Sequence, residues 1–170
     1  MNRILSSIFQ KIAYIAPGGC SIRPTLQRLR GAHIEENVWI SQFVYIDEIH
    51  PEAIFIGKNS AIGIKTSIIA HTYWGPRRDT KAYKEVIIEK DVYVGPHCLI
   101  LPGVHIGEGA VIKGGSVLTR NVPARTFWGS PEGRPLAMVT TPLTNAHSYE
   151  QFVKGLRPIR QRTRCDKTRQ

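Results

Sequence analysis

The sequence lacks several features that would place it in a familiar functional class. No run of 18 apolar residues occurs, so no membrane-spanning helix is expected. The three cysteines at positions 20, 98 and 165 form no CxxC or zinc-binding spacing, which excludes a disulfide framework or zinc finger. No GxSxG, Walker or HExxH motif is present. The thiols are expected to be reduced, which is typical of a cytoplasmic protein.

Acidic residues are scarce, and the excess positive charge is concentrated at the C-terminus. The chain has 23 Lys and Arg against 13 Asp and Glu, a formal net charge of +10. Residues 154–170 contain seven basic residues and one acidic residue, a net of +6, which leaves +4 for the rest. Such a tail can contact nucleic acid, anionic lipid or an acidic polymer. We expect a solvated, disordered tail and no nucleic acid partner.

The first 31 residues predict a helical segment. Isoleucines at positions 4, 8 and 12 share one face of a helix over residues 2–15, and Pro17 and Gly18 end it. A second short helix is expected over residues 22–30. We expect the first helix to pack on the body of the protein or on a neighbouring subunit. Weak contact with a membrane surface is the alternative.

From residue 34 onward an aliphatic residue returns every sixth position. A helix repeats every 3.6 residues and a strand every 2, so six fits the strand period only. The fourth residue after each aliphatic residue is small or β-branched at eleven of twelve repeats, and the third is Asn, Asp or Gly at seven. The aliphatic residues are Ile34, Ile40, Ile46, Ile56, Ile62, Ile68, Ile88, Val94, Ile100, Ile106, Ile112 and Leu118.

These three columns predict a triangular coil of 18 residues. Side chains alternate along a strand, so each short strand sends one large and one small residue inward. Corners at the third position favour Gly, Asn and Asp, which tolerate positive φ. Stacked coils would then pair every strand with the coils above and below. The sequence predicts an all-β protein, a parallel β-helix of hexapeptide repeats over residues 32–126.

The rhythm is interrupted twice. The step from Ile46 to Ile56 is ten residues, and the step from Ile68 to Ile88 is twenty. The second interruption predicts a loop over residues 73–85 that protrudes from the coil. Excursions from a rigid scaffold often bear binding residues, so we interpret this loop as a functional arm.

His71 is the candidate catalytic residue because it lies immediately before the protruding loop. Both His71 and His97 occupy a corner position, which a histidine tolerates. Tyr73 and Trp74 follow His71 and could bind a hydroxylated acceptor through their aromatic faces. An imidazole at such a place suits a general base.

A metal site is the weaker interpretation of the histidines. His33 and His105 fall on the outer face of the predicted sheets, and His147 lies beyond the repeats. His71, His97 and His105 have no spacing that brings their rings together within one chain, as three zinc ligands would require. We therefore expect no metal.

Four stretches of sequence resemble the hexapeptide-repeat acyltransferases, the left-handed β-helix family. Within that family the chain resembles the bacterial sugar and polysaccharide O-acetyltransferases over roughly residues 29–135. The stretches are "LRGAHIEENVWI", "IGKNSAIG", "SIIAH" and "VYVGPHCLILPGVHIGEGAVIKGGSVLTRNVP". The resemblance implies a left-handed coil and a homotrimer with active sites between neighbouring subunits.

The resemblance also implies roles for individual residues. His71 matches the place of the family's catalytic histidine, and acetyl-CoA is the implied co-substrate. Asp47 is a candidate for contacting the acceptor, with Tyr73 and Trp74. The residues that correspond to the family's coenzyme A site are Pro96, Gly114, Thr119, Arg120 and Arg134.

The sequence therefore predicts an acetyl-CoA-dependent O-acetyltransferase that acts on a sugar, polysaccharide or glycan precursor. Its parts would be a helical segment over 1–31, the coil over 32–126, a C-terminal segment over 127–153 and the basic tail over 154–170. Two alternatives stay open: a metal-dependent hydratase like the γ-class carbonic anhydrases, and a non-catalytic trimeric binding scaffold.

Overall fold

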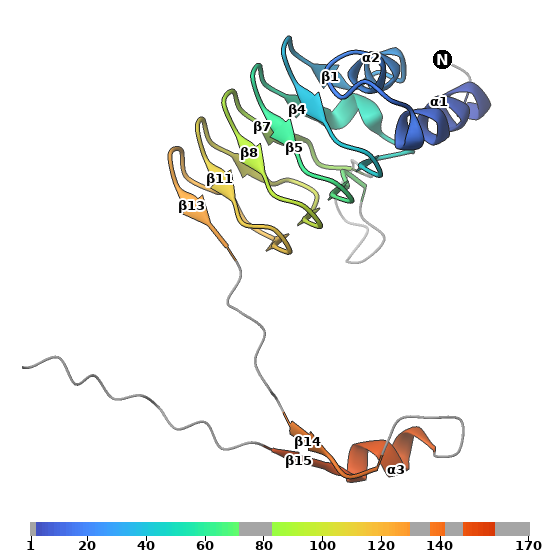
Figure 1. Ribbon diagram of the computed structural model, residues 1–170, viewed down its shortest axis with the longest axis vertical. Helices are drawn as coiled ribbons and strands as arrows, with labels where there is room; N and C mark the ends of the chain where they lie inside the picture. Colours follow the sequence, from blue (N-terminus) through green and yellow to red (C-terminus); the bar gives the residue numbers. More distant parts are fainter. Residues whose placement is uncertain (1–2, 72–82, 130–136, 142–147, 159–170) are drawn as a thin grey trace, which may run out of the picture. The chain divides into compact units, whose positions relative to one another are not determined.

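A computed structural model describes residues 3–71, 83–129, 137–141 and 148–158 (Figure 1). The chain divides into two compact units, Met1–Ser130 and Pro131–Gln170. The described residues of the first unit form two α-helices and a three-sided coil of short strands. The described residues of the candidate site all lie in this unit. Within the described residues, no helix is long and apolar enough to cross a membrane.

Three parallel sheets form the sides of the coil, and successive strands from β1 to β12 belong to sheets A, B and C in turn. Each strand is two or three residues long and pairs in register with the equivalent strand of the next coil, as Ile34 pairs with Ile56. We name the corners A/B, B/C and C/A after the sheets that they join. Figure 1 shows the successive coils stacked along one axis.

The strands of each sheet are as follows. Sheet A contains β1 (His33–Ile34), β4 (Ile54–Ile56), β7 (Val86–Ile88) and β10 (His105–Ile106). Sheet B contains β2 (Trp39–Ile40), β5 (Ala61–Ile62), β8 (Tyr93–Val94), β11 (Val111–Ile112) and β13 (Phe127–Trp128). Sheet C contains β3 (Tyr45–Ile46), β6 (Ser67–Ile68), β9 (Leu99–Ile100) and β12 (Val117–Leu118).

The interior of the coil consists of the two inward columns that the sequence predicts. All twelve aliphatic residues at the repeating position are at most 7% exposed. The described residues of the small column other than His50 are buried beside them. Their hydroxyl groups donate to main-chain carbonyls, as Ser60 does to Glu89 at 2.9 Å and Thr66 to Gly95 at 3.0 Å. Buried hydroxyls with such partners avoid most of the desolvation cost of their burial.

The corners adopt the positive φ that the third position of each repeat predicts. Asn37, Asn59 and Asp91 have φ of 54°, 61° and 59° and stack at the A/B corner. Their side chains form a ladder, since Asn37 donates to Asn59 at 3.0 Å and Asn59 donates to Asp91 at 2.9 Å. Phe43 and Lys65 also have positive φ, so the coil imposes this conformation on residue types that do not favour it.

Two helices, α1 (Arg3–Ile15) and α2 (Ile22–Leu29), pack at the N-terminal end of the coil. The expectation that α1 packs on the body is met in part, but the helix uses its polar face. Gln10 and Gln27 are buried and bonded to each other at 2.9 Å, and both accept from the buried Arg30. The apolar face of α1 is exposed.

The described residues of the second unit form a small antiparallel pair and one helix. Strand β14 (Ala137–Val139) pairs with β15 (Leu156–Pro158), and α3 (Tyr149–Lys154) lies between them in the chain. Residues 154–158, which we placed in the tail, thus include the end of α3 and β15, and residues 159–170 lie outside the described residues. The coil itself continues two residues past 126, because β13 pairs with β11.

We expect Ile100→Ala to lower the free energy of unfolding by about 2–5 kcal/mol, because Ile100 is fully buried between sheets and the cavity cannot close. The matched control is Val117→Ala on the adjacent strand β12, where the side chain is half exposed, with an expected cost below about 1 kcal/mol. Urea unfolding of both variants measures the difference. Equal losses of unfolding free energy in the two variants would contradict the assignment of the aliphatic residues to the interior of the coil.

Candidate functional site

Both interruptions of the six-residue rhythm fall at the C/A corner, on successive coils. The first follows β3 and contains a short 3₁₀ helix, η1 (Pro51–Ala53). The second follows β6, and the chain returns at Tyr83, whose main chain forms an antiparallel bridge with His71. The extra residues therefore accumulate at one edge of an otherwise regular coil.

The carboxylate of Asp47 is the centre of this corner. It is fully buried and accepts five hydrogen bonds from the two interrupted segments. Oδ1 accepts from the main-chain N–H of Ile49 and of His50, both at 2.9 Å. Oδ2 accepts from the main-chain N–H of Ala70 at 2.7 Å and of His71 at 3.0 Å, and it lies 2.6 Å from the His71 ring atom Nδ1.

These bonds keep Asp47 ionised inside the protein. Burial by itself raises the pKa of a carboxyl group, because it disfavours the charged form. Here the main-chain N–H groups of His50, His71, Ala70 and Ile49 outweigh burial and hold the pKa of Asp47 below its usual value. A buried anion with five donors around it is a fixed partner for the imidazole.

The Asp47 carboxylate also determines which ring nitrogen of His71 is protonated. An ionised carboxylate can only accept, so Nδ1 of His71 must donate to it. The neutral ring then has its lone pair on Nε2. The His71 side chain is 11% exposed, so the ring is held largely inside the corner while it stays in reach of the surface.

His50 and Tyr83 lie beside this pair, and sequence reasoning did not identify either of them as site residues. Their rings stack with centroids 4.4 Å apart. His50 Nδ1 lies 2.9 Å from the carboxylate of Glu52. The ten-residue step around His50 was the only signal for this group in the sequence, because the step showed where extra residues had to leave the coil.

The N-terminal helical segment also forms hydrogen bonds to Asp47 and to its neighbour Glu48. Arg30, which follows α2, donates to the main-chain carbonyl of Asp47 at 2.7 Å. Ser7 of α1 donates to the Glu48 carboxylate at 2.6 Å. The segment that positions the carboxylate is therefore attached to the N-terminal helices as well as to the coil.

The predicted site residues fall into three groups. Thr119 and Arg120 follow β12 at the C/A corner, the same corner as His71 and about 10 Å further along the coil axis. Pro96 and Gly114 stack at the B/C corner, where Gly115 N–H donates to the Pro96 carbonyl at 2.8 Å. Tyr73, Trp74 and Arg134 lie outside the described residues.

Two expectations about individual residues need correction. Asp47 was expected to contact the acceptor, but its carboxylate is fully buried and its two oxygens bind the two interrupted segments, so it positions His71 instead. His71 was expected to be a left-handed corner residue. It is not among the described residues with positive φ, and its main chain forms an antiparallel bridge with Tyr83. His97, in contrast, has φ of 56° at the B/C corner.

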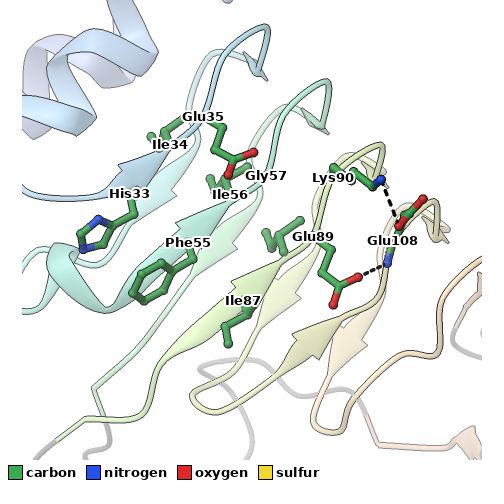
Figure 2. A pocket seen from close by; sticks show the side chains of 11 residues that line it. His33, Ile34, Glu35, Phe55, Ile56, Gly57, Ile87, Glu89, Lys90 and Glu108 are labelled. Carbon is green, nitrogen blue, oxygen red and sulfur yellow. Dashed lines mark hydrogen bonds and ion pairs between the residues drawn. The ribbon is translucent and has the colours of Figure 1, made fainter.

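An open hollow of about 650 Å³ lies on the outer face of sheet A (Figure 2). It extends from the strands toward the A/B corner, the opposite edge from His71. Its polar groups bind each other: Glu89 lies 2.7 Å from His105 Nε2 and accepts from the Glu108 N–H, and Lys90 pairs with Glu108 at 3.3 Å. The C/A corner is therefore the candidate functional site.

In the part of the chain that the structure describes, no group of three or more His, Cys, Asp or Glu could hold a metal ion.

The sequence profile described as "Bacterial transferase hexapeptide (six repeats)" matches residues 85–120. The matched segment therefore carries the repeats of the bacterial hexapeptide transferases. The fold of the chain is the left-handed parallel β-helix that the sequence resemblance implied.

Several curated acetyltransferases are similar to part of this chain. YvoF of Bacillus subtilis (strain 168), whose name proposes acetyltransferase activity, is 37% identical over 97 residues, 56% of this chain and 52% of YvoF. A 2,3,4,5-tetrahydropyridine-2,6-dicarboxylate N-acetyltransferase of Staphylococcus aureus (strain bovine RF122 / ET3-1) is 49% identical over 74 residues, 44% of this chain and 30% of that protein. A galactoside O-acetyltransferase of Lactococcus lactis subsp. lactis (strain IL1403) is 35% identical over 83 residues, 46% of this chain and 40% of that protein. The matches thus span about half or less of these relatives.

A solved structure shares the fold. The hexapeptide-repeat acetyltransferase VCA0836 from Vibrio cholerae O1 biovar eltor, in complex with acetyl coenzyme A, has a TM-score of 0.54 and 20% sequence identity. The match covers 75% of this chain and 81% of that chain.

We expect Asp47→Asn to lower the free energy of unfolding at neutral pH by roughly 3 kcal/mol, because the amide NH₂ would face main-chain donors and leave them without an acceptor. A carboxyl group with a lowered pKa stabilises the fold above its unfolded value, about 3.9, and this stability is lost as the pH falls through the folded pKa. Thermal unfolding between neutral and acid pH should therefore show a weaker acid dependence in the variant.

The matched control is Asp91→Asn. Asp91 is exposed at the A/B corner, where equivalent positions of other coils already hold Asn. This control should leave the melting temperature nearly unchanged. If both variants melt together at neutral pH, Asp47 does not organise the corner.

Proposed function

We propose that this protein transfers an acetyl group from acetyl-CoA to a hydroxyl group of a sugar or glycan precursor, with His71 as the general base. The observation that supports this most directly is the buried Asp47 carboxylate 2.6 Å from Nδ1 of His71. A carboxylate in that place orients an imidazole and stabilises its protonated form, which a base needs during proton transfer. The pair lies at the C/A corner, where the main chain of His71 forms a bridge with Tyr83.

The proton transfers follow from the tautomer. Nε2 of His71 takes the proton of the acceptor hydroxyl while the hydroxyl oxygen forms a bond to the thioester carbonyl carbon. Asp47 stabilises the resulting imidazolium through Nδ1. The C–S bond then breaks, and His71 returns its proton to the thiolate that leaves. The acetyl-CoA supplies the activated acetyl group, and no covalent bond to the protein is needed.

The described residues of the implied coenzyme site fit a phosphate-bearing chain in two places. Arg120 is exposed at the C/A corner and suits a phosphate group. Gly114 lies against Pro96 so closely that an added Cβ would meet the Pro96 ring and carbonyl at 3.1 Å. A side chain at residue 114 would crowd this surface, so the glycine keeps it low enough for an extended ligand to pass.

A homotrimer would explain why the implied site residues lie at two corners. His71, Thr119 and Arg120 lie at the C/A corner, and Pro96 and Gly114 lie at the B/C corner. The full width of sheet C, at most about 20 Å, separates the two corners within one chain. Two neighbouring subunits that place a C/A corner against a B/C corner would complete one site from both sets.

The relatives support two kinds of acceptor group, a hydroxyl and an amine. The galactoside O-acetyltransferase supports a sugar hydroxyl as the acceptor. The N-acetyltransferase has a higher sequence identity to this chain over a shorter stretch, so an amino group is the second candidate acceptor. A general base serves both reactions, because either nucleophile must lose a proton. A panel of hydroxyl and amine acceptors, with release of free coenzyme A thiol as the readout, distinguishes them.

We expect His71→Ala to lower kcat for acetyl transfer by roughly 10²–10⁴-fold, the usual contribution of a general base. The control is His33→Ala, on the exposed outer face of sheet A, which should retain most of the activity. Both variants should keep a native mass of three 19.1 kDa chains by light scattering. Near wild-type turnover by His71→Ala would contradict the assignment of the base.

We expect Arg120→Ala to raise the KM for acetyl-CoA by roughly tenfold while kcat changes little, because a lost phosphate contact weakens binding in the ground state and transition state alike. Lys58→Ala is the control, since Lys58 is an exposed cation at the A/B corner. Steady-state kinetics and direct titration with coenzyme A measure the effect. Wild-type protein that does not bind coenzyme A would favour the scaffold or hydratase alternatives.

A further inference from the structure

An apolar stripe runs along the solvent side of α1. Leu5, Ile8, Ile12 and Ile15 are between 42% and 64% exposed, and Ile4 is 70% exposed. At about 100° per residue these five side chains fall within an arc of about 100°. Aliphatic side chains that share one helix face usually pack against the body of their own protein. Here they face away from it.

The polar contacts of the opposite face hold α1 in this orientation. Ser6, Gln10 and Ala13 lie on the buried side of the helix. Gln10 accepts hydrogen bonds from Gln27 and from the buried Arg30, whose guanidinium also reaches the carbonyl of Asp47. A rotation that buried the stripe would break these bonds and leave the Arg30 charge buried without partners, which is strongly unfavourable. The stripe is therefore a fixed part of the surface.

The charge of the N-terminal segment indicates what covers the stripe. Residues 1–31 contain five Lys and Arg and no Asp or Glu, and two of these cations, Arg23 and Arg30, are buried. Lys11 is exposed and lies within about 20° of the edge of the stripe on a helical projection. Segments with this charge repel each other, which disfavours a second copy of the chain as the occupant. One face of a 13-residue helix is also small beside the roughly 800 Å² that each partner contributes to a standard interface.

We propose that α1 docks on the surface of an anionic lipid bilayer, with the stripe among the acyl chains and Lys11 at the headgroups. An aliphatic helix face bordered by a cation, on a helix too short to span, is the usual form of an interfacial helix. The inference does not depend on the acetyltransferase function. Docking would bring the C/A corner toward the membrane, because Ser7 of α1 bonds to Glu48, next to Asp47.

The test is flotation of the full-length protein with vesicles of phosphatidylcholine alone or mixed with phosphatidylglycerol. Wild type should float with the anionic vesicles and bind neutral ones at least about fivefold more weakly, since each cation near an anionic surface contributes about 1 kcal/mol. The double variant Ile8→Ser/Ile12→Ser should weaken binding to anionic vesicles by roughly tenfold or more, because two half-exposed aliphatic groups are lost. Lys11→Gln should weaken it by about fivefold.

Phe127→Ser is the matched control, because Phe127 is the most exposed large apolar side chain that the structure describes, and it lies on the coil rather than on α1. It should bind vesicles as wild type does. Unchanged binding of the double variant would overturn the proposal, because the basic tail would then be responsible. So would failure of the wild type to float with anionic vesicles. A smaller mass of the double variant in light scattering without lipid would also overturn it, since the stripe would then be a contact between subunits.

Discussion

The paired inward columns are the constraint on which the rest of the structure depends. Strands of two or three residues have little stability by themselves, and here each strand from β1 to β12 is held by a buried aliphatic residue and by a partner strand on the neighbouring coil. The large residue fills the interior beside a small one, so three sides of equal length can close. Corners with positive φ, such as Asn37 and Asn59, follow from that closure. The resulting frame is rigid enough to hold a side chain in one orientation.

The candidate site occupies the one corner where this regularity is interrupted on successive coils. Asp47, which directly follows the inward Ile46, places a fully buried charge at this corner. That charge is tolerated because main-chain N–H groups from both interruptions converge on it, so the carboxylate organises the two segments and His71 together. The same bonds that satisfy a buried anion also fix the proton on one nitrogen of the imidazole.

Sequence reasoning succeeded where the period was regular and failed where it was not. The buried columns, the A/B corners and the place of His71 before an excursion all follow from spacing. The contact between Asp47 and His71 does not, because 24 residues separate them and no multiple of 18 relates them. The sequence left open whether the aliphatic face of α1 packs on the body or points outward, because periodicity alone cannot rank that face against the buried Gln10 and Arg30 contacts.

Each coil pairs only with the coils directly before and after it, as β6 does with β3 and β9. Inserting or deleting one whole turn beyond β12 would therefore leave Asp47 and His71 where they are. Such a change would lengthen or shorten the coil along its axis by one strand spacing, about 4.8 Å, and would alter only the length of its outer surface. A scaffold of this kind can evolve to match ligands of different length without altering its reactive end.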